Sequence, residues 1–423
     1  MKNKLIGIVL SLIVLIFTAI PYYEGLLKKM ESESLFQQNI RNLDETNDQY
    51  QEETKNSDGN SGVSATEVDS LKLLAKSAAL MDAESGRVLF EKDGYNEMPM
   101  ASTTKIMTCI VALENAKLDD VVTISKYAST MPDVQLNVSA GEQYILNDLL
   151  YSLMLESHND VAVAIAEHVG GSVEGFAKMM NKKAKELGCK HTNFVTPNGL
   201  DADGHYTTAA ELAKIASYAI KNKDFINITN TASHSFRELK KGRTFTVSNK
   251  DRFLYMYDGA IGIKTGFTGK AGYCFVGAVK KNGKTLVSAV LGCGWPPHKS
   301  YKWSDTITLM NYGMKNFEKR QIFDSNKEFD PVQVIDGKIN QVGLHYDGDI
   351  SLLIGKNEVV KVVYKIPAAI PAPVEADTVV GSAKYYVGDQ LIEEVPILTT
   401  SSIERIDFKD VINKILHVWM MDK

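Results

Sequence analysis

The chain has 423 residues, of which 44% are hydrophobic and 23% charged, a balance that is normal for a folded protein with a sizeable core. Its formal net charge of −5 comes from residues 31–60, which hold eight acidic and two basic side chains. The rest of the chain is close to neutral, which gives no electrostatic reason to expect nucleic-acid binding. These values exclude a fibrous or mostly disordered protein.

Residues 1–27 have the pattern of a targeting segment. Lys2 and Lys4 precede an uninterrupted apolar run from Leu5 to Ile20, which is intermediate in length between a signal-peptide core and a membrane span. The positive flank places the N-terminus in the cytoplasm and the rest of the chain outside. We expect a cleaved signal peptide or a retained anchor, because no clean A-x-A site decides between them. The protein is therefore expected to be extracytoplasmic, secreted or anchored on the outer face of the cytoplasmic membrane.

Residues 28–70 differ in composition from the rest of the chain. They are polar and acidic, rich in Asn, Gln, Ser and Glu, and contain few apolar residues. Such a segment cannot bury enough apolar surface to offset its loss of conformational entropy on ordering. We therefore expect a disordered acidic tether.

Residues 71–322 combine strand and helix patterns. Apolar runs flank Ser85-Gly86 and Asn282-Gly283, a pattern typical of two β-hairpins. Four stretches between the hairpins and one after them carry apolar residues at helical spacing. These stretches are residues 146–157, 160–171, 173–188, 208–222 and 302–317. The order predicts an α+β fold, in which one antiparallel sheet is assembled from both ends of the segment and covered by helices.

Residues 323–403 predict a second, small β-rich domain. Short β-rich runs are separated by turns at Lys356-Asn357 and Gly388-Asp389, and helical spacing is absent from these runs. No obvious chemical residues stand in this segment.

Residues 404–423 place apolar side chains on one helical stripe that includes Trp419. We expect an amphipathic helix that binds the membrane surface, with Trp419 at headgroup depth. Lys409, Lys414 and Lys423 would face the lipid phosphates. The alternative is a helix that packs on the β domain.

The cysteines give no sign of a metal site. Four of them are widely spaced, without a C-x-x-C pair, and no H-E-x-x-H motif occurs. A structural disulfide and buried free thiols are both compatible with this spacing. The residues are Cys109, Cys189, Cys274 and Cys293.

Ser102 and Lys105 stand three residues apart in the stretch MASTTKIMT, at the predicted start of a helix. Residues i and i+3 share a helix face, so the Lys105 amine can reach the Ser102 hydroxyl. Unpaired N–H groups at a helix N-terminus would also stabilise an oxyanion there. A lysine acts as a base only when burial or a neighbouring cation lowers its pKa. By itself the pair is weak evidence and is much more typical of an ordinary helix cap, and a catalytic pair requires a second lysine nearby.

Two further motifs change this interpretation. Ser157 and Asn159 form an S-x-N element between two helical stretches, and Lys264, Thr265 and Gly266 lead into the second hairpin. The ordered set S-x-x-K, S-x-N and K-T-G is the one described for penicillin-binding proteins and class A β-lactamases. The three motifs together favour a serine acyl-transfer site.

With these motifs the chain resembles the serine D-alanyl-D-alanine carboxypeptidases of the low-molecular-mass penicillin-binding protein family. The stretches GIKTGFTGKAGYC and PNGLDADGHYTTAAELAKIA are similar to stretches of that family, and the β domain with its final helix resembles the family's C-terminal domain and anchor. The resemblance covers residues 71–423. It implies a DD-peptidase/β-lactamase-like fold, peptidoglycan stem peptides as substrates, β-lactams as inhibitors, and no metal or cofactor.

The resemblance also implies the catalytic roles. Ser102 would attack the carbonyl between the two terminal D-alanines, and Lys105 would take the proton from its hydroxyl. Ser157 would pass a proton to the leaving D-alanine. Water would then hydrolyse the acyl-enzyme.

The remaining motif residues would bind substrate. Asn159 would bind the amide backbone of the substrate, and Lys264 would hold the base neutral and, with Thr265, receive the terminal carboxylate. Gly266 would permit close approach of the substrate to the sheet edge. The backbone N–H groups of the nucleophile and of Phe267 would form the oxyanion hole.

Three positions depart from the family pattern or need a separate interpretation. His158 stands where the motif has Asp, and we expect a solvated loop histidine, with titration near the site as the alternative. Relatives carry an arginine near Gly294, but none stands here, which puts any carboxylate-binding role of that position in doubt. His205 has no required role in this mechanism, so we expect it to be structural.

Other functions use the same or similar motifs. A class A β-lactamase needs a glutamate in an E-x-x-L-N context between the second and third motifs, but the nearest match begins at Glu142, before Ser157, and is off by one residue. A DD-endopeptidase or transpeptidase would share every catalytic residue; chain size and the β domain favour the carboxypeptidase. A non-catalytic wall-binding protein is disfavoured because all nucleophile and base positions are filled.

Overall fold

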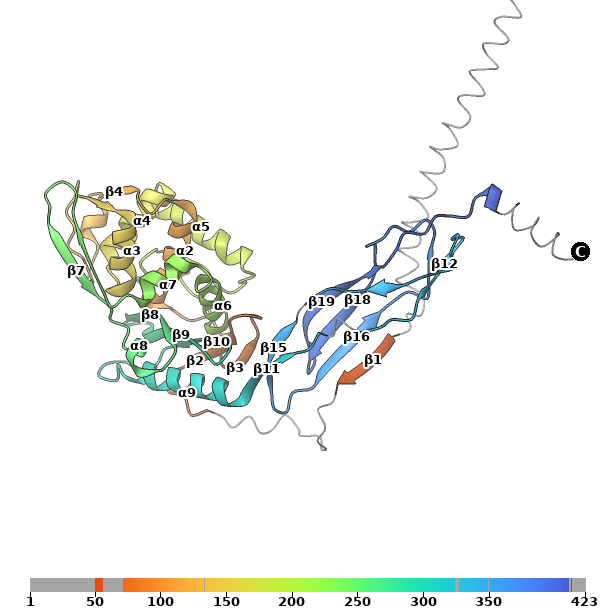
Figure 1. The fold of residues 1–423 in the computed structure, drawn as a ribbon. Coiled ribbons are helices and arrows are strands. Elements are labelled where there is room, and N and C mark those ends of the chain that lie inside the picture. The colour runs from red at the N-terminus through yellow and green to blue at the C-terminus, as the bar shows by residue number, and fades with distance from the viewer. Residues whose placement is uncertain are drawn as a thin grey trace, which may run out of the picture. The chain divides into compact units, whose positions relative to one another are not determined.

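The computed structural model describes residues 50–55, 71–132, 134–323, 327–348, 350–410 and 412. They divide into two compact units. The first ends at Phe323 and also takes in Ile350–Glu358, and the second holds the described residues of 1–58, 324–349 and 359–423. Figure 1 shows the mixed helix and strand content of the first unit and the strands of the second.

A five-stranded antiparallel sheet organises the first unit, in the order β3-β2-β10-β9-β8 (Figure 1). Both predicted hairpins are confirmed. The turn between β9 and β10 has positive φ at Asn282 (52°) and Gly283 (72°), as a tight Asn-Gly hairpin turn requires. The strands are β2 (Ser77–Asp82), β3 (Val88–Lys92), β8 (Ala260–Thr268), β9 (Gly272–Lys281) and β10 (Lys284–Leu291).

Both faces of this sheet are buried. Ala79 and Met81 of β2 belong to the larger core, which α2 to α7 complete, whereas the alternate residues Ala78 and Leu80 pack with α9 in a second core. Figure 1 shows α9 below the sheet and most of the other helices above it. The helices are α2 (Lys105–Asn115), α3 (Leu146–Leu155), α4 (Asn159–Gly170), α5 (Val173–Glu186), α6 (Ala209–Ala219), α7 (Lys223–Asn230) and α9 (Tyr301–Asn316).

The five predicted helical stretches are confirmed as α3, α4, α5, α6 and α9. Several short elements were not predicted, because each is too brief to establish a hydrophobic period. They are α7, the pair β4 (Val121–Thr123) and β5 (Gln143–Ile145), and the hairpin of β6 (Ser233–Arg237) and β7 (Thr244–Ser248).

The second unit is the predicted β domain. Its described strands form the sheets β1-β16-β18-β19-β14 and β13-β12-β17. Val360, Val362 and Tyr364 of β16 are buried, and the residues between them are partly exposed, so β16 has one face in a core. The strands are β1 (Tyr50–Lys55), β12 (Val332–Ile335), β13 (Gln341–Val342), β14 (Leu344–His345), β16 (Val360–Lys365), β17 (Ala369–Pro371), β18 (Val379–Val387) and β19 (Gln390–Thr399).

Two strands differ from the prediction made from the sequence, one in its secondary structure and one in the unit to which it belongs. β1 falls within the expected tether but pairs antiparallel with β16, because the edge of β16 supplies hydrogen-bond partners that composition does not reveal. β15 (Ser351–Gly355), expected in the β domain, pairs with β11 (Phe317–Gln321) in the first unit. The chain therefore passes between the two units four times.

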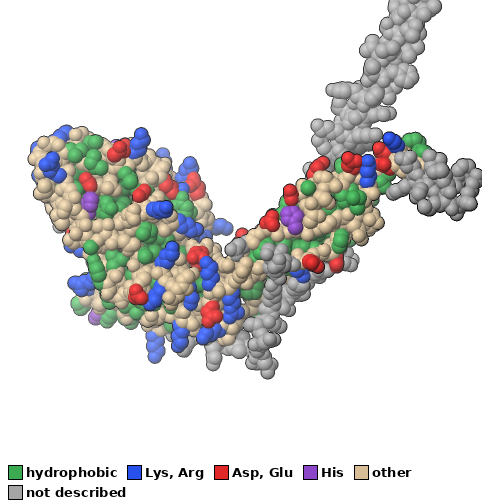
Figure 2. Space-filling view, in the orientation of Figure 1, with side chains coloured by type: hydrophobic (Ala, Val, Ile, Leu, Met, Phe, Trp, Pro, Cys, Tyr) green, Lys and Arg blue, Asp and Glu red, His purple; other side chains and the backbone are tan. Residues whose placement is uncertain are grey.

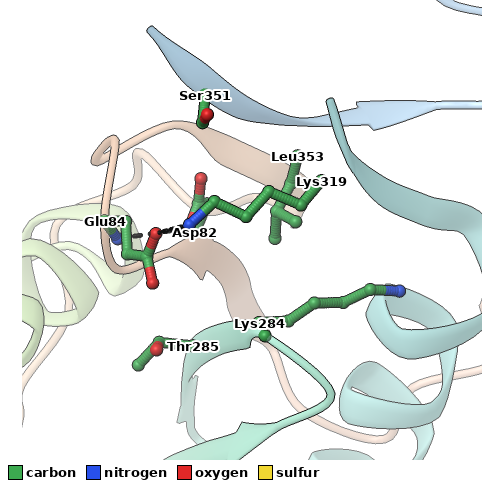
Figure 3. A pocket seen from close by; sticks show the side chains of 8 residues that line it. Asp82, Glu84, Lys284, Thr285, Lys319, Ser351 and Leu353 are labelled. Carbon is green, nitrogen blue, oxygen red and sulfur yellow. Dashed lines mark hydrogen bonds and ion pairs between the residues drawn. The ribbon is translucent and has the colours of Figure 1, made fainter. Parts of the chain in front are cut away.

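Side chains of the first unit hold β15 in place. The Arg87 guanidinium donates to the carbonyl oxygen of Leu353 at 2.6 Å and forms a close ion pair with Glu358. Figure 3 shows the adjoining hollow, where Lys319 points to Glu84 and their charged atoms are 2.6 Å apart. The predicted site residues do not line this hollow.

The two ends of the chain are described only in part. The predicted signal or anchor lies outside the described residues, and so does most of the helix expected over residues 404–423. Residues 408–410 are helical, and Phe408 is 81% exposed. Within the described ranges, no helix has the length and apolar character needed to cross a membrane.

The surface seen in Figure 2 is mixed in charge. Lys and Arg side chains alternate with Asp and Glu over both units on this face. That mixture agrees with the near-neutral balance of the chain outside residues 31–60. The viewed face therefore shows no large area of a single sign.

Candidate active site

Ser102 lies in η1 (Ala101–Thr104), a 3-10 turn that runs directly into α2. The preceding residue, Ala101, has a φ of 49°, which is strained for a residue with a Cβ. The hydroxyls of Thr103 and Thr104 donate to the carbonyl oxygens of Met100 (2.6 Å) and Ala101 (2.8 Å). These bonds fix the sharp turn that presents the serine.

Lys105 is fully buried at the start of α2. Its Nζ lies 3.0 Å from the Ser102 hydroxyl, 2.8 Å from Oδ1 of Asn159 and 2.5 Å from the carbonyl oxygen of Asn198. Burial, and then the charge of Lys264, hold the pKa of Lys105 well below its ordinary value, and Asp160 opposes them. The expected contact between Ser102 and Lys105 is therefore present, and the amine is favoured in its neutral form.

Ser157 and Asn159 of the second motif join α3 to α4 beside this pair. Ser157 has a φ of 73°, and its Oγ is buried without a hydrogen-bond partner in the described part of the chain. Asn159 begins α4, and its Nδ2 donates to the carbonyl oxygen of Pro132 at 3.1 Å. The strained backbone thus holds the Ser157 hydroxyl in a position where no described residue forms a hydrogen bond with it.

His158 is not the solvated loop histidine that the sequence favoured. Only 4% of it is exposed, because its ring packs between the end of α3 and the start of α4. Its Nδ1 lies 2.7 Å from the Ser152 hydroxyl, and its Nε2 lies 3.4 Å from a Glu156 carboxylate oxygen. Burial lowers the pKa of His158, against the opposing charges of Asp160 and Glu156, which favours the neutral ring.

The third motif lies on β8, an edge strand of the sheet. Lys264 is 1% exposed, and burial lowers its pKa to about 7 against the opposing charge of Asp251. A Cβ on Gly266 would lie 3.1 Å from the backbone nitrogen of Ser102, so a side chain here would require β8 and η1 to move apart by a few tenths of an ångström. Phe267 is 43% exposed, and its ring lies 4.6 Å from that of Tyr273.

The loop that carries Asn198 is a part of the site that sequence reasoning missed. The Asn198 carbonyl oxygen accepts from Lys105, and it lies 3.4 Å from the Ser102 hydroxyl. The next residue, Gly199, has a φ of 81°, and a Cβ there would collide with the carbonyl of Ala101. The Asn-Gly pair is a turn signal in the sequence, but no local pattern shows where its carbonyl points.

His205 supports this loop, in agreement with the structural role expected for it. Its Nδ1 accepts from the backbone nitrogen of Val195 at 3.0 Å, so its Nε2 carries the proton and donates to the Thr104 hydroxyl at 2.9 Å. Burial lowers the pKa of His205 to about 4. The neutral ring therefore links the Asn198 loop to η1.

The four cysteines are free and buried, without a disulfide between them. Across the described residues, no three His, Cys, Asp or Glu side chains gather in a way that could hold a metal ion. The groups that contact Nζ of Lys105 are the Ser102 hydroxyl, the Asn159 side-chain oxygen and the Asn198 carbonyl oxygen.

Comparison with known proteins agrees with this geometry. Residues 63–294 match the family described as D-alanyl-D-alanine carboxypeptidase. The chain belongs to the D-alanyl-D-alanine carboxypeptidase family. Residues 317–405 match the C-terminal domain of penicillin-binding protein 5. The predicted family, fold class and enzyme class are confirmed, and the protein is a serine D-Ala-D-Ala carboxypeptidase.

Several relatives of this carboxypeptidase are similar over most of their length. D-alanyl-D-alanine carboxypeptidase DacF of Bacillus subtilis (strain 168) is 30% identical over 353 residues, covering 82% of this chain and 90% of the relative. Penicillin-binding protein 5 from Haemophilus influenzae has a TM-score of 0.67 at 27% identity, covering 79% of this chain and 98% of that one. The Streptomyces K15 DD-transpeptidase has a TM-score of 0.54 at 34% identity, covering 57% and 97%. Members of this carboxypeptidase family act on peptidoglycan peptides outside the cytoplasm and bind β-lactams.

Proposed function

We propose that Ser102 is the nucleophile and that neutral Lys105 is its base. The observation that carries this proposal is the set of three oxygens around Nζ of Lys105, two of which, on Asn159 and Asn198, can only accept hydrogen bonds. A neutral amine has two N–H groups and one lone pair. It donates to those two oxygens, and its lone pair accepts the proton of the Ser102 hydroxyl at 3.0 Å.

Acylation follows from this arrangement. Ser102 Oγ bonds to the carbonyl carbon between the two terminal D-alanines while its proton moves to Lys105. The developing oxyanion would accept hydrogen bonds from the backbone N–H groups of Ser102 and Phe267. Gly266 lies close to the Ser102 backbone, so β8 and η1 are adjacent. This proximity supports an oxyanion hole formed by one N–H group from each element.

Departure of D-alanine requires a proton on its nitrogen. We assign its delivery to Ser157, whose buried hydroxyl has no hydrogen-bond partner in the described residues and is therefore free to bond to substrate. The C–N bond breaks as the proton arrives, leaving the shortened stem peptide as an ester on Ser102. Asn159, which already holds Lys105 through Oδ1, would bind the substrate amide.

Lys264 and Thr265 would receive the terminal carboxylate. A buried cation attracts a carboxylate strongly, because water does not screen the pair. The same positive charge lowers the pKa of Lys105. One lysine thus selects a C-terminal residue and keeps the base neutral.

Lys105 then passes its proton to the Ser157 oxygen, which restores the Ser157 hydroxyl and the neutral amine. Water completes the cycle by attacking the ester carbonyl: Lys105 takes a proton from this water and gives it to the Ser102 oxygen as the stem peptide leaves. A β-lactam amide would be opened by the same attack. Its leaving group stays attached to the acyl chain, so water is hindered from the ester. We therefore expect penicillins to persist on Ser102.

Release of D-alanine tests this function. Purified protein, with Ser102→Ala as the matched control, is incubated with a peptide ending in D-Ala-D-Ala, and free D-alanine is measured. We expect release by the native protein and none by the variant. Equal release by both, or none by folded native protein, would contradict the proposal.

Transpeptidation and endopeptidation use the same residues, and the similarity to the Streptomyces K15 DD-transpeptidase makes the first a specific second candidate. The acceptor distinguishes them: water gives a shortened peptide, whereas an amine gives a cross-linked product. We expect hydrolysis to dominate when both a D-amino acid acceptor and water are present. Mass analysis of the products measures the ratio.

We also propose that the C-terminal segment attaches the enzyme to the outer face of the cytoplasmic membrane. Phe408 is 81% exposed and Ile412 is 38% exposed, and both belong to the apolar stripe expected over residues 404–423. Apolar side chains on one face of a helix bind the headgroup boundary, and lysines on the other face contact lipid phosphates. The N-terminal apolar run would act as a second attachment if it is retained.

A further inference from the structure

Asp201 is an exposed carboxylate in the loop that carries Asn198, and the mechanism above does not use its charge. One oxygen, Oδ1, accepts the Thr268 hydroxyl at 2.9 Å. The Thr268 oxygen itself accepts the backbone N–H of Ala271 at 3.0 Å, so its single proton is donated to Asp201. The carboxylate is therefore held in one position although it is exposed to solvent.

The negative charge of Asp201 has no partner of opposite sign in the described part of the chain. Its Oδ2 makes no hydrogen bond there, and no described lysine or arginine forms an ion pair with either oxygen. Lys270, in the turn between β8 and β9, is exposed and is not paired with it. An oriented carboxylate oxygen without a cation is available to bind one from outside the chain.

Two paths along the chain place Asp201 near the nucleophile. The Asn198 carbonyl oxygen lies 3.4 Å from the Ser102 hydroxyl, and the three residues that follow it span at most about 11 Å. A Cβ on Gly266 would lie 3.1 Å from the Ser102 backbone nitrogen, and Thr268 is two residues further along β8, at most about 7 Å. Asp201 therefore lies at the edge of the site.

The direction of β8 indicates which part of the substrate would pass Asp201. Side chains alternate between the faces of a regular strand, so Thr268 projects to the same side as Gly266, which faces η1. In the proposed function the terminal carboxylate is bound at Thr265 and the reacting carbonyl at the N–H of Phe267. Thr268 continues this order, so it lies beside the substrate residue that precedes D-Ala-D-Ala.

We propose that Asp201 binds a positively charged side chain on the stem-peptide residue immediately before D-Ala-D-Ala. This inference rests on the proposed function, which fixes the direction of the peptide along β8. An amine on a flexible, lysine-like side chain can reach the edge of the site and donate a charge-assisted hydrogen bond to Oδ2. Because Oδ1 is already held by Thr268, the carboxylate loses little conformational entropy on binding. The enzyme therefore prefers stem peptides with a diamino acid at this position.

Release of D-alanine from three peptides that differ in one residue tests this preference. The full chain is incubated with acetyl-X-D-Ala-D-Ala, in which X is lysine, norleucine or glutamate, and kcat and KM are measured for each peptide. We expect kcat/KM to be about threefold to fivefold higher for lysine than for norleucine, and lowest for glutamate. The difference should lie in KM more than in kcat. It should shrink in about 1 M salt, because the ion pair is exposed.

Three variants separate the charge of Asp201 from its support of the loop. Asp201→Asn keeps an oxygen for the Thr268 hydroxyl and removes the charge, so the lysine-to-norleucine ratio of kcat/KM should fall to about one. Asp201→Lys reverses the charge, and the glutamate peptide should become the preferred substrate. The matched control is Asp203→Asn, which alters an exposed aspartate of the same loop that makes no hydrogen bond within the described residues. It should keep the native order of the three peptides.

A native lysine-to-norleucine ratio near one, or an unchanged ratio in Asp201→Asn, would overturn the inference. An equal loss of kcat/KM for all three peptides in Asp201→Asn would also overturn it, because the residue would then only support the loop. Retention of the native order in Asp201→Lys has the same meaning. Failure of the proposed function is a different result, since the native protein would then release D-alanine from none of the three peptides.

Discussion

The Ser157 hydroxyl is buried and makes no hydrogen bond within the described residues, so its removal should affect activity far more than stability. We expect Ser157→Ala to lower kcat/KM by about 10²-fold or more, because proton delivery to the leaving group is lost. The free energy of unfolding should change by less than about 0.5 kcal/mol. Peptide hydrolysis and urea unfolding measure the two quantities.

Ser152→Ala is the matched control for this experiment. The Ser152 hydroxyl lies 2.7 Å from Nδ1 of buried His158, so its removal leaves the ring nitrogen without a partner. We expect a loss of about 1–2 kcal/mol in stability with smaller loss of activity. A stability loss in Ser157→Ala equal to that in Ser152→Ala would contradict the role given to Ser157.

His205 should make stability depend on pH. Its pKa is lowered to about 4 by burial, whereas the unfolded chain binds a proton near pH 6.5. Between these values the unfolded state holds more protons, so the free energy of unfolding falls as pH decreases from 6.5 towards 4. Urea unfolding of the native protein and His205→Gln at pH 7 and pH 5 should show a smaller decrease for the variant. The exposed His298 gives the control, His298→Gln, and equal decreases for all three proteins would refute this assignment.

At the level of single residues, the catalytic side chains were predicted from the sequence, but the groups that position them were not. Ser102 and Lys105 were predicted to meet because i and i+3 share a helix face, and they do so at 3.0 Å. The Asn198 carbonyl was missed, because a backbone oxygen has no signature in a sequence. The prediction that His158 is solvent-exposed was wrong, because the sequence around a single residue between two helices does not indicate whether its side chain is buried.

The approach of β8 to η1 gives a prediction at the scale of elements. A Cβ at Gly266 would lie 3.1 Å from the backbone nitrogens of Ser102 and Thr103. We expect Gly266→Ala to displace β8 by a few tenths of an ångström and to lower the rate of acylation by penicillin about tenfold or more. Stopped-flow measurement with a fluorescent penicillin gives this rate.

Gly269→Ala provides the control on the same hairpin. A Cβ there would meet no atom within 4 Å, so acylation should proceed at close to the native rate. A native rate in Gly266→Ala would contradict the close packing of β8 on η1. A comparable loss in both variants would show that the effect is not specific to that contact.

The elements with strong local signals were those predicted correctly. The turn at Asn282-Gly283 and the long apolar periods of α4 and α6 are visible in the sequence. β6 and β7 are five residues each and are largely exposed, so they carry little periodic signal. β1 and β15 depend on partners distant in the sequence, which no local pattern identifies.

At the scale of the whole molecule, attachment and catalysis should be separable. We expect deletion of residues 407–423 to reduce sedimentation of the protein lacking residues 1–70 with anionic liposomes, because the apolar stripe and its lysines are removed. The rate of D-alanine release from a soluble peptide should not change. Unchanged sedimentation would instead favour a helix that packs on the β domain.

The organisation of the whole molecule was predicted in outline. A catalytic unit and a β domain follow from the change from helical to strand patterns near residue 323. The finer boundary was not predictable, because Ile350–Glu358 returns to the first unit. It does so through the contacts of Arg87 with Leu353 and Glu358, which only the folded chain reveals.

The proposed mechanism depends on acylation of Ser102, and mapping of a penicillin adduct measures which residue is acylated. Native protein is incubated with benzylpenicillin and digested, and the modified peptide is identified by mass spectrometry. We expect one adduct, on the peptide that contains Ser102, and none in a folded Ser102→Ala variant. An adduct on another residue, or no adduct on folded native protein, would exclude Ser102 as the nucleophile.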